Sequence, residues 1–507
     1  MSTSRWSGRW LPRIAGALAF AVALVDSSAT HAKVAQAPAR AARLPNIILY
    51  LADDIGREAF GAYGGTSYKT PNIDKLAAEG MRFNRAYATA LCTPTRSELL
   101  TGQYNFRNYD DFGYLDTAQR TIANYLQAAG YTTAIAGKWQ LGGGSQTPHN
   151  FGFDEYLLWQ LETGDYWGRF KNPTLTRNGE PTRKHPGKYG PDVLSDFVLD
   201  FIERHRAEPF FVFYSEVLTH DPFQPTPDHP DYAAHDETRV NDPKYFPGMV
   251  GYLDRNVGKL VAKLDALGIR EQTLVIFMGD NGTSPQITSV MNGRPVRGDK
   301  AGHLDTAIHV PLIASWKGTI NPGQVRDDLV EALDVFATAF EAGRVTVPNV
   351  RKDGFSLYPT LTTGAPSPRR WIFTDFYRQR TPGPNTQRSD GGIAGAPARY
   401  VHDARYKLHA NGEFFDYVAD PLEQRPITEA TRSPEEQAAY QTLRDLLTRM
   451  EAEVKRWDAR RLDEPLQSAN PNAGRGGRGG GRGRGAGGRG GAGQDPGGAP
   501  AGRPDPK

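Results

Sequence analysis

Two pairs of carboxylate and amide side chains follow apolar segments that are typical of buried strands. Asp53 and Asp54 end the segment NIILYLADD, and Asp280 and Asn281 follow TLVIFMG. Ligands of open α/β sheets bind beyond the carboxyl ends of the parallel strands, where we expect both pairs. Oxygen donors of this kind suit a hard cation such as calcium or magnesium. Each pair could also form a turn or a helix cap, so the residues alone leave both roles open.

The single cysteine of the chain, Cys92, lies in the segment ALCTPTRSELLTGQY. Pro94 predicts that a helix begins here, because proline is favoured in the first turn. Arg96 would then lie on the same face as Cys92, beside N–H groups that can bind an anion. A lone cysteine is usually a small buried hydrophobic residue, but these polar neighbours favour a chemical role. One cysteine also excludes an intramolecular disulfide, a cysteine-ligated zinc site and an iron–sulfur cluster.

The elements that must position these residues follow an α/β pattern. Continuous apolar runs bounded by turn residues predict strands that are buried on both faces of a mostly parallel sheet, at 46–54, 132–139, 209–216, 273–282 and 309–316. Helical patterns lie between them, at 73–80, 121–130, 193–206 and 249–267. This alternation predicts an α/β domain with helices on both faces of the central sheet.

The pattern changes after about residue 365. Three shorter runs, RWIFTDFY, ARYVHDARYKLHAN and GEFFDYV, predict an antiparallel sheet, and a charged helix follows near 433–458. A tail rich in glycine and arginine ends the chain and is expected to be disordered. We therefore expect a signal peptide at 1–32, a catalytic domain at 44–365, a smaller C-terminal α+β subdomain at 366–468 and a disordered tail at 469–507.

The N-terminal segment is typical of a secretory signal, with basic residues followed by the apolar run IAGALAFAVALV. This run is too short to span a bilayer comfortably, so we expect export to the periplasm or the medium without stable membrane insertion. The 507-residue chain has a net charge of +3; the N-terminal segment carries +2 and the tail +5, which leaves −4 for the body. The tail could bind RNA, but export and the acidic body lead us to expect no nucleic-acid partner.

Several motifs together resemble those of a known family. Cys92-Thr93-Pro94-Thr95-Arg96, with Thr101-Gly102, is similar to the Cys-x-Pro-x-Arg…Thr-Gly signature of the formylglycine-dependent sulfatases, within the alkaline phosphatase superfamily. The segments NIILYLADDIG and MGDNG resemble the metal-binding strands of that family, AGKWQLG and RGDKAGHLDTAIHVPLI its lysine motifs, THDPFQP its histidine loop, and GEFFDYVADPLEQ a C-terminal motif. The resemblance covers roughly residues 44–425, with the motifs in the expected order.

The resemblance implies a role for each matching residue. Cys92 would be converted to formylglycine by a formylglycine-generating enzyme, and the hydrate of this aldehyde would attack the sulfur of a sulfated substrate and later expel sulfate. One calcium ion would be bound by residue 92 together with Asp53, Asp54, Asp280 and Asn281. Arg96, Lys138 and Lys300 would balance the negative charge, and His220 would protonate the leaving alkoxide. The implied activity is the hydrolysis of sulfate esters, with a sulfated small molecule or glycan as substrate.

One position departs from the motif. Gln140 stands where the family usually supplies a histidine to the formylglycine hydroxyl, and an amide cannot act as a base near neutral pH. Two alternatives therefore stay open: a phosphonate monoester or phosphodiester hydrolase with the same nucleophile, and an inactive, sulfatase-like protein that binds glycans.

Other charged residues receive weaker assignments. His303 and His309 are expected to be surface or packing residues. Four basic residues occupy a stretch between Trp167 and Pro191 that we predict to be irregular, and they could bind a sulfated sugar or simply be solvated: Arg177, Arg183, Lys184 and Lys188.

Overall fold

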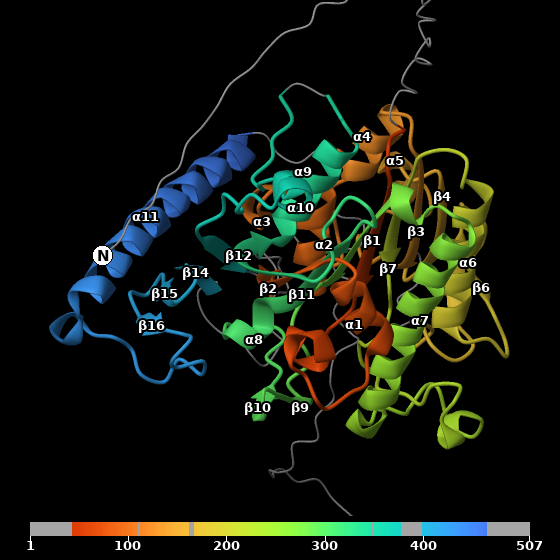
Figure 1. Cartoon of the computed structure of the whole chain (residues 1–507), viewed down its shortest axis with the longest axis horizontal. Helices are drawn as coiled ribbons and strands as arrows, with labels where there is room; N and C mark the ends of the chain where they lie inside the picture. The colour runs from red at the N-terminus through yellow and green to blue at the C-terminus, as the bar shows by residue number, and fades with distance from the viewer. Residues whose placement is uncertain (1–42, 110–111, 162–166, 347–348, 377–397, 464–507) are drawn as a thin grey trace, which may run out of the picture. The chain divides into compact units, whose positions relative to one another are not determined.

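A computed structural model describes residues 43–109, 112–161, 167–346, 349–376 and 398–463. The described residues from Leu44 onward form one compact unit. This unit contains a ten-stranded sheet with helices on both faces and a four-stranded antiparallel sheet near its C-terminal end (Figure 1). The predicted fold class is therefore confirmed. The predicted signal segment and the Gly/Arg-rich tail both lie outside the described residues.

Five neighbouring strands of the large sheet are parallel. In spatial order they are β8 (Thr273–Gly279), β1 (Asn46–Ala52), β7 (Phe210–Ser215), β3 (Thr132–Lys138) and β4 (Glu155–Trp159). The register pairs Ala52 with Gly279, and Leu51 with Ser215, so these strands end at nearly the same level. The residues that follow them therefore meet at one edge, as the sequence predicted.

The outer strands make the sheet mixed. β11 (His309–Ser315) runs antiparallel to β8 and to β2 (Met81–Tyr87), and β12 (Gln324–Glu331) pairs parallel to β2 at one edge. The short strands β5 (Thr174–Arg177) and β6 (Arg183–Lys184) extend the other edge. The prediction that residues 167–191 are irregular was therefore wrong for 174–177 and 183–184, whereas most of the rest of this stretch consists of turns, bends and residues without regular structure. The two strands are short and contain charged residues, so they lack the continuous apolar run that predicts a buried strand.

Helices cover both faces because successive residues of a strand point to opposite sides. Ile47, Leu49 and Leu51 of β1 pack in a core with α2 (Cys92–Thr101), α4 (Ile122–Ala128) and α9 (Ala332–Ala342). Ile48, Tyr50 and Ala52 pack in a second core with α1 (Pro71–Ala78), α6 (Gly190–Arg204) and α7 (Phe246–Ala266). Shorter elements complete this part of the fold: α3 (Asn105–Asn108), α5 (Thr147–Asn150), β9 (Thr288–Met291), β10 (Arg294–Arg297), α8 (Asp305–Ile308) and α10 (Tyr358–Thr363).

The C-terminal sheet consists of β13 (Ile372–Phe376), β14 (Ala398–His402), β15 (Tyr406–His409) and β16 (Phe414–Asp416), paired antiparallel in chain order. One of its faces packs against α11 (Pro434–Asp463), as Figure 1 shows. Ile372 and Tyr400 on the other face pack in a cluster with Leu91, the residue before Cys92. The small sheet therefore contacts the segment that leads into α2. Within the described ranges, no helix is long and apolar enough to cross a membrane.

Candidate active site

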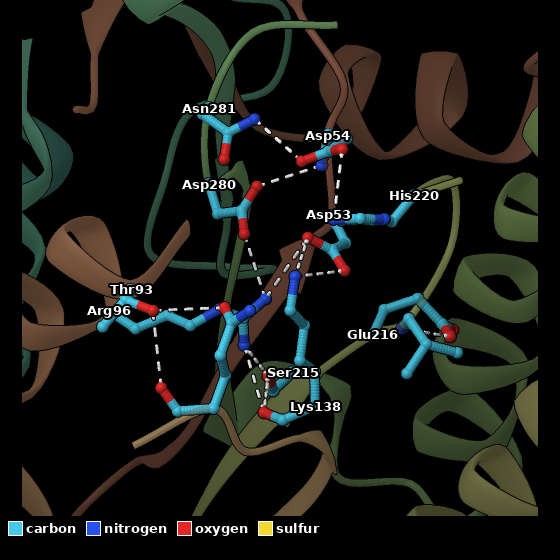
Figure 2. A network of polar contacts seen from close by, with 12 residues as sticks. Asp53, Asp54, Thr93, Arg96, Lys138, Ser215, Glu216, His220, Asp280 and Asn281 are labelled. Carbon is cyan, nitrogen blue, oxygen red and sulfur yellow. Dashed lines mark hydrogen bonds and ion pairs between the residues drawn. The ribbon is translucent and has the colours of Figure 1, made fainter. Parts of the chain in front are cut away.

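The two predicted ligand pairs lie side by side in the structure (Figure 2). Asp53 and Asp54 follow β1, and Asp280 and Asn281 follow the neighbouring β8. All four side chains are buried, with at most 1% of each residue exposed. The Asp54 backbone N–H donates to Asp280 Oδ1 at 3.0 Å, and Asn281 Nδ2 donates to Asp54 Oδ1 at 2.9 Å. One carboxylate oxygen of each aspartate lies within 4.8 Å of the others.

Two features of this cluster fit a hard cation. The amide oxygen Oδ1 of Asn281 is buried without a hydrogen-bond partner among the described residues. Burial and the nearby charge of Asp53 raise the pKa of Asp280 to about 7, which reflects the repulsion between buried carboxylates. A divalent cation would accept the free oxygen as a ligand and offset this repulsion. The donor set, three carboxylates and one amide oxygen, is the kind that calcium prefers.

Cys92 lies at the first position of α2, where the backbone changes from the extended conformation of Leu91 to helix. Its Sγ lies within 4.8 Å of a carboxylate oxygen of Asp53 and of a ring nitrogen of His220. Burial raises the pKa of the Cys92 thiol, although Lys138 and Lys300 act in the opposite direction. An unmodified thiol would therefore be protonated at neutral pH and would be a poor nucleophile.

Two buried cations, one from α2 and one from β3, pair with the aspartates. Arg96, one turn after Cys92, donates from Nη2 to Asp280 Oδ2 at 3.0 Å. Lys138, the last residue of β3, donates from Nζ to both carboxylate oxygens of Asp53, at 2.8 and 2.9 Å. Burial alone would raise the pKa of Asp53, but Lys138 and the other cations lower it. Asp53 is therefore a carboxylate at neutral pH.

Lys300 and His220 also contact the cluster, both through Asp54. Lys300 Nζ donates to Asp54 Oδ2 and lies 2.9 Å from His220 Nε2. Asp54 raises the pKa of Lys300 against the opposing effect of burial, so this ammonium group is charged. Burial lowers the pKa of His220, and Lys300 and Lys138 lower it further, although Asp54 opposes them. His220 is thus neutral near pH 7, with Nε2 accepting from Lys300 and Nδ1 directed at Asp221, 2.9 Å from its Oδ1.

Gln140 also lies beside the cysteine segment. Thr93 Oγ1 lies 3.2 Å from Gln140 Oε1, and Thr93 directly follows Cys92. Gln140 has a φ of 52°, in the left-handed region. The Gln140 side chain accepts a hydrogen bond from Thr93, the neighbour of Cys92, but it supplies no group that titrates near neutral pH.

Sequence reasoning missed Ser215, the last residue of β7. Its Oγ donates to the Lys138 carbonyl at 2.6 Å and accepts from Arg96 Nη1, so it links α2 to β3 (Figure 2). Its position in the sequence could have identified it. Ser215 is a small polar residue at the carboxyl end of a buried strand, and the aspartates also directly follow buried strands.

Other candidates lie away from this cluster. His309 is buried and packs between Asp305 and the Asn84 carbonyl, whereas His303 is exposed. Both agree with the expectation of packing and surface residues. Of the basic residues at 167–191, Arg183 pairs with Glu180 at 3.6 Å and Lys184 with Glu237 at 3.7 Å. Arg177 and Lys188 are exposed too, and none of the four contacts the cluster described above.

The fold has counterparts among solved structures. The PsFucS1 sulfatase from Pseudoalteromonas sp. superimposes with a TM-score of 0.64 at 23% identity, over 84% of this chain and 92% of that chain. BT4656, in complex with its substrate D-glucosamine-2-N,6-O-disulfate, gives 0.64 at 21% identity, over 84% and 100%. A phosphonate monoester hydrolase of Agrobacterium radiobacter gives 0.60 at 20%, over 81% and 96%. At these identities the likeness shows the shared fold alone.

Sequence comparison identifies the family. The model of the family described as Sulfatase matches residues 45–345, and that of the N-sulphoglucosamine sulphohydrolase C-terminal region matches residues 298–453. Human arylsulfatase A is 32% identical over 378 residues, which cover 66% of this chain and 71% of that protein. Human N-acetylgalactosamine-6-sulfatase is 30% identical over 363 residues, covering 63% and 66%. Both names denote sulfuric ester hydrolases, and the chain therefore belongs to the sulfatase family.

Proposed function

We propose that this protein hydrolyses sulfate esters of carbohydrates, with Cys92 converted to formylglycine and one calcium ion at the aspartate cluster. The observation that carries the proposal is the position of Cys92, buried at a helix N-terminus and within 4.8 Å of Asp53 and His220. A protonated, buried thiol would be a poor nucleophile at this position. An aldehyde hydrate would offer one hydroxyl to attack the sulfur and a second one whose deprotonation releases sulfate.

The charges of the site support binding of an anion. Three carboxylates and three cationic side chains gather here, so the protein groups nearly balance one another at neutral pH. A bound calcium ion would add two positive charges and act as a Lewis acid toward the sulfate oxygens. That excess would match one sulfate ester and one deprotonated hydroxyl. Arg96, Lys138 and Lys300, which pair with the three aspartates, would orient the sulfate group and stabilise the charge that develops on its oxygens.

Proton transfer would fall to His220. It is the titratable base whose ring nitrogen lies close to Cys92 Sγ, and Gln140 cannot take or give a proton near neutral pH. Lys300, charged and 2.9 Å from Nε2, would supply hydrogen-bonding support to the imidazole. His220 would protonate the leaving alkoxide of the sugar. A protein that only binds glycans would not need this arrangement.

The carbohydrate substrate is inferred from the relatives. One of them is named for N-acetylgalactosamine 6-sulfate, and one structural neighbour is bound to a disulfated glucosamine. We also propose that the chain is exported and meets a formylglycine-generating enzyme during maturation, in keeping with the secretory character of residues 1–32.

The function is tested by comparing ester classes with the purified protein. We expect release of sulfate from 4-nitrophenyl sulfate and from sulfated amino sugars, and much slower hydrolysis of bis(4-nitrophenyl) phosphate and of phenylphosphonate monoesters. Faster turnover of the phosphorus esters would replace the sulfatase proposal with the phosphodiesterase alternative. If aldehyde-bearing protein released no sulfate but bound heparin, the glycan-binding alternative would stand instead.

Replacing His220 is expected to separate substrates by leaving group. His220→Gln should lower kcat for a sugar sulfate by about 10²- to 10⁴-fold, but for 4-nitrophenyl sulfate by less than about tenfold, because nitrophenolate leaves without a proton. Because the pKa of His220 is lowered, its acid form is populated only at acidic pH. The kcat/KM for a sugar sulfate should therefore fall as the pH rises through this pKa. In His220→Gln, this decrease of kcat/KM with rising pH should be absent.

The control for this prediction is His235→Gln. His235 is also buried, with Nδ1 2.7 Å from the Tyr232 carbonyl, in the same stretch of chain as His220 but outside the site. His235→Gln should leave the ratio of the activities on sugar sulfate and on 4-nitrophenyl sulfate unchanged. Equal losses on both substrates in His220→Gln would contradict the role in leaving-group protonation.

A further inference from the structure

We propose that Lys407, on β15 of the C-terminal sheet, is a positioning residue that holds the loop carrying Lys300. This inference rests on the proposed function of Lys300. Lys407 Nζ donates to the carbonyl oxygen of His303 at 2.6 Å and forms an ion pair with Glu423. The side chains of Lys407 and Glu423 are only 1% and 2% exposed. A buried ammonium group from one sheet is thus bonded to the main chain of an active-site loop.

The loop, residues 298–304, connects β10 to α8 and is attached on the side of the active site by two backbone bonds. The N–H of Lys300 donates to the Thr283 carbonyl at 3.1 Å, and the N–H of Ala301 donates to the Ala90 carbonyl at 2.9 Å. Ala301 has a φ of 69°, which is unfavourable for alanine. Within the loop, the Gly302 N–H donates to the Asp299 carbonyl at 2.7 Å and the Leu304 N–H to Asp299 Oδ2 at 3.0 Å. The bond from Lys407 to His303 adds an attachment of this end of the loop to the small sheet.

The position of Lys407 is itself well defined. Glu423 Oε1 pairs with the ammonium group, while Oε2 lies 2.7 Å from His409 Nε2. The ammonium also lies 4.5 Å from the centre of the Tyr400 ring, on the neighbouring strand β14. The group is therefore fixed by a carboxylate from the segment after β16, a carbonyl of the loop and an aromatic ring of β14.

A purely structural role accounts poorly for this pair. Removing an ammonium and a carboxylate from water costs so much that apolar residues of similar volume often stabilise a fold equally well or better. An apolar side chain, however, cannot donate to the His303 carbonyl. We therefore take the hydrogen bond to the His303 carbonyl as the contribution of Lys407 that an apolar residue could not make. Because misplacing a catalytic group by about 1 Å can cost about 100-fold in rate, that bond bears on the position of the Lys300 ammonium between Asp54 and His220.

The first test is a double-mutant cycle. Lys407→Met combined with Glu423→Gln removes both charges together and leaves no ion buried alone. We expect this pair to lower kcat/KM for 4-nitrophenyl sulfate by about 10- to 100-fold, but by less than about twofold in a Lys300→Ala background. Lys407→Arg, which keeps a donor, should retain activity within about threefold. Equal fold losses in both backgrounds would show a general structural effect and overturn the proposal.

The second test does not need activity. Hydrogen exchange of the amides in residues 298–304 should be at least about tenfold faster in the charge-removed pair. The control, Arg405→Met, removes the ion pairs of a half-exposed arginine with Asp416 and Glu435 beside the same strand and should leave that exchange unchanged. If the wild-type protein hydrolysed no sulfate ester, the proposed function would fail. Hydrogen exchange of residues 298–304 would still test whether Lys407 holds the loop. Unchanged loop exchange in the pair would overturn the attachment whatever the activity.

Discussion

Cys92→Ser is expected to fold normally and to lose multiple turnover of 4-nitrophenyl sulfate by at least about 1,000-fold. A serine hydroxyl in this position could accept a sulfuryl group once, but it carries no second hydroxyl whose deprotonation would expel sulfate. Removing a nucleophile from a preorganised site typically costs several orders of magnitude in kcat, because the neighbouring groups act as a unit. Steady-state kinetics and a search for covalently sulfated protein at residue 92 would measure the loss.

The matched control is Ser97→Ala on the same helix. Ser97 is buried, and its hydroxyl donates to the Thr93 carbonyl within α2 at 3.0 Å, away from the aspartates. We expect it to change kcat by less than about threefold, with a loss of stability on the order of 1 kcal/mol. Undiminished multiple turnover in Cys92→Ser would contradict any mechanism that depends on residue 92 as formylglycine.

Asp280→Asn should weaken calcium binding by about 100-fold or more and lower kcat/KM to a similar extent at low calcium. The substitution removes one of three buried carboxylates that surround the cation site and also the partner of Arg96. Isothermal titration with calcium would measure the affinity directly. High calcium concentrations should restore part of the activity, because the remaining donors still bind the ion weakly.

Asp254→Asn provides the control for this prediction. Asp254 is a buried aspartate on α7 that accepts the Ile73 backbone N–H at 2.8 Å, as Asp280 accepts that of Asp54 at 3.0 Å, but it lies outside the cluster. Its replacement should lower stability and leave the calcium affinity unchanged. Equal calcium affinity in wild-type protein and Asp280→Asn would contradict the assignment of this aspartate as a ligand.

The parallel core of the fold could be predicted because its strands are buried on both faces. β1 and β8 are uninterrupted apolar segments, and no pattern other than a buried strand accounts for them as well. β2 and β12 were missed because both contain charged residues and are only partly buried. Their strand conformation comes from pairing with each other and, for β2, with β11, and these contacts depend on the tertiary fold.

Some residues of the candidate site could likewise be predicted from the local sequence, and others could not. The carboxylate pairs could be located because each directly follows a strand, whereas Lys138, His220 and Lys300 carry no local pattern and were assigned through the resemblance. Ser215 and Lys407 could not be found from the sequence. Ser215 bonds with Arg96, 119 residues away, and Lys407 lies 104 residues from the loop that it contacts. Such contacts exist only once the sheets are assembled.

The most direct measurement of the central claim is mass spectrometry of the peptide containing Leu91–Arg96, from protein made in its native host. We predict that residue 92 has lost one sulfur and two hydrogen atoms and gained one oxygen, the change from a thiol to an aldehyde. We also predict that an aldehyde-specific reagent labels this peptide. An intact thiol at Cys92 in all of the active protein would exclude formylglycine as the nucleophile.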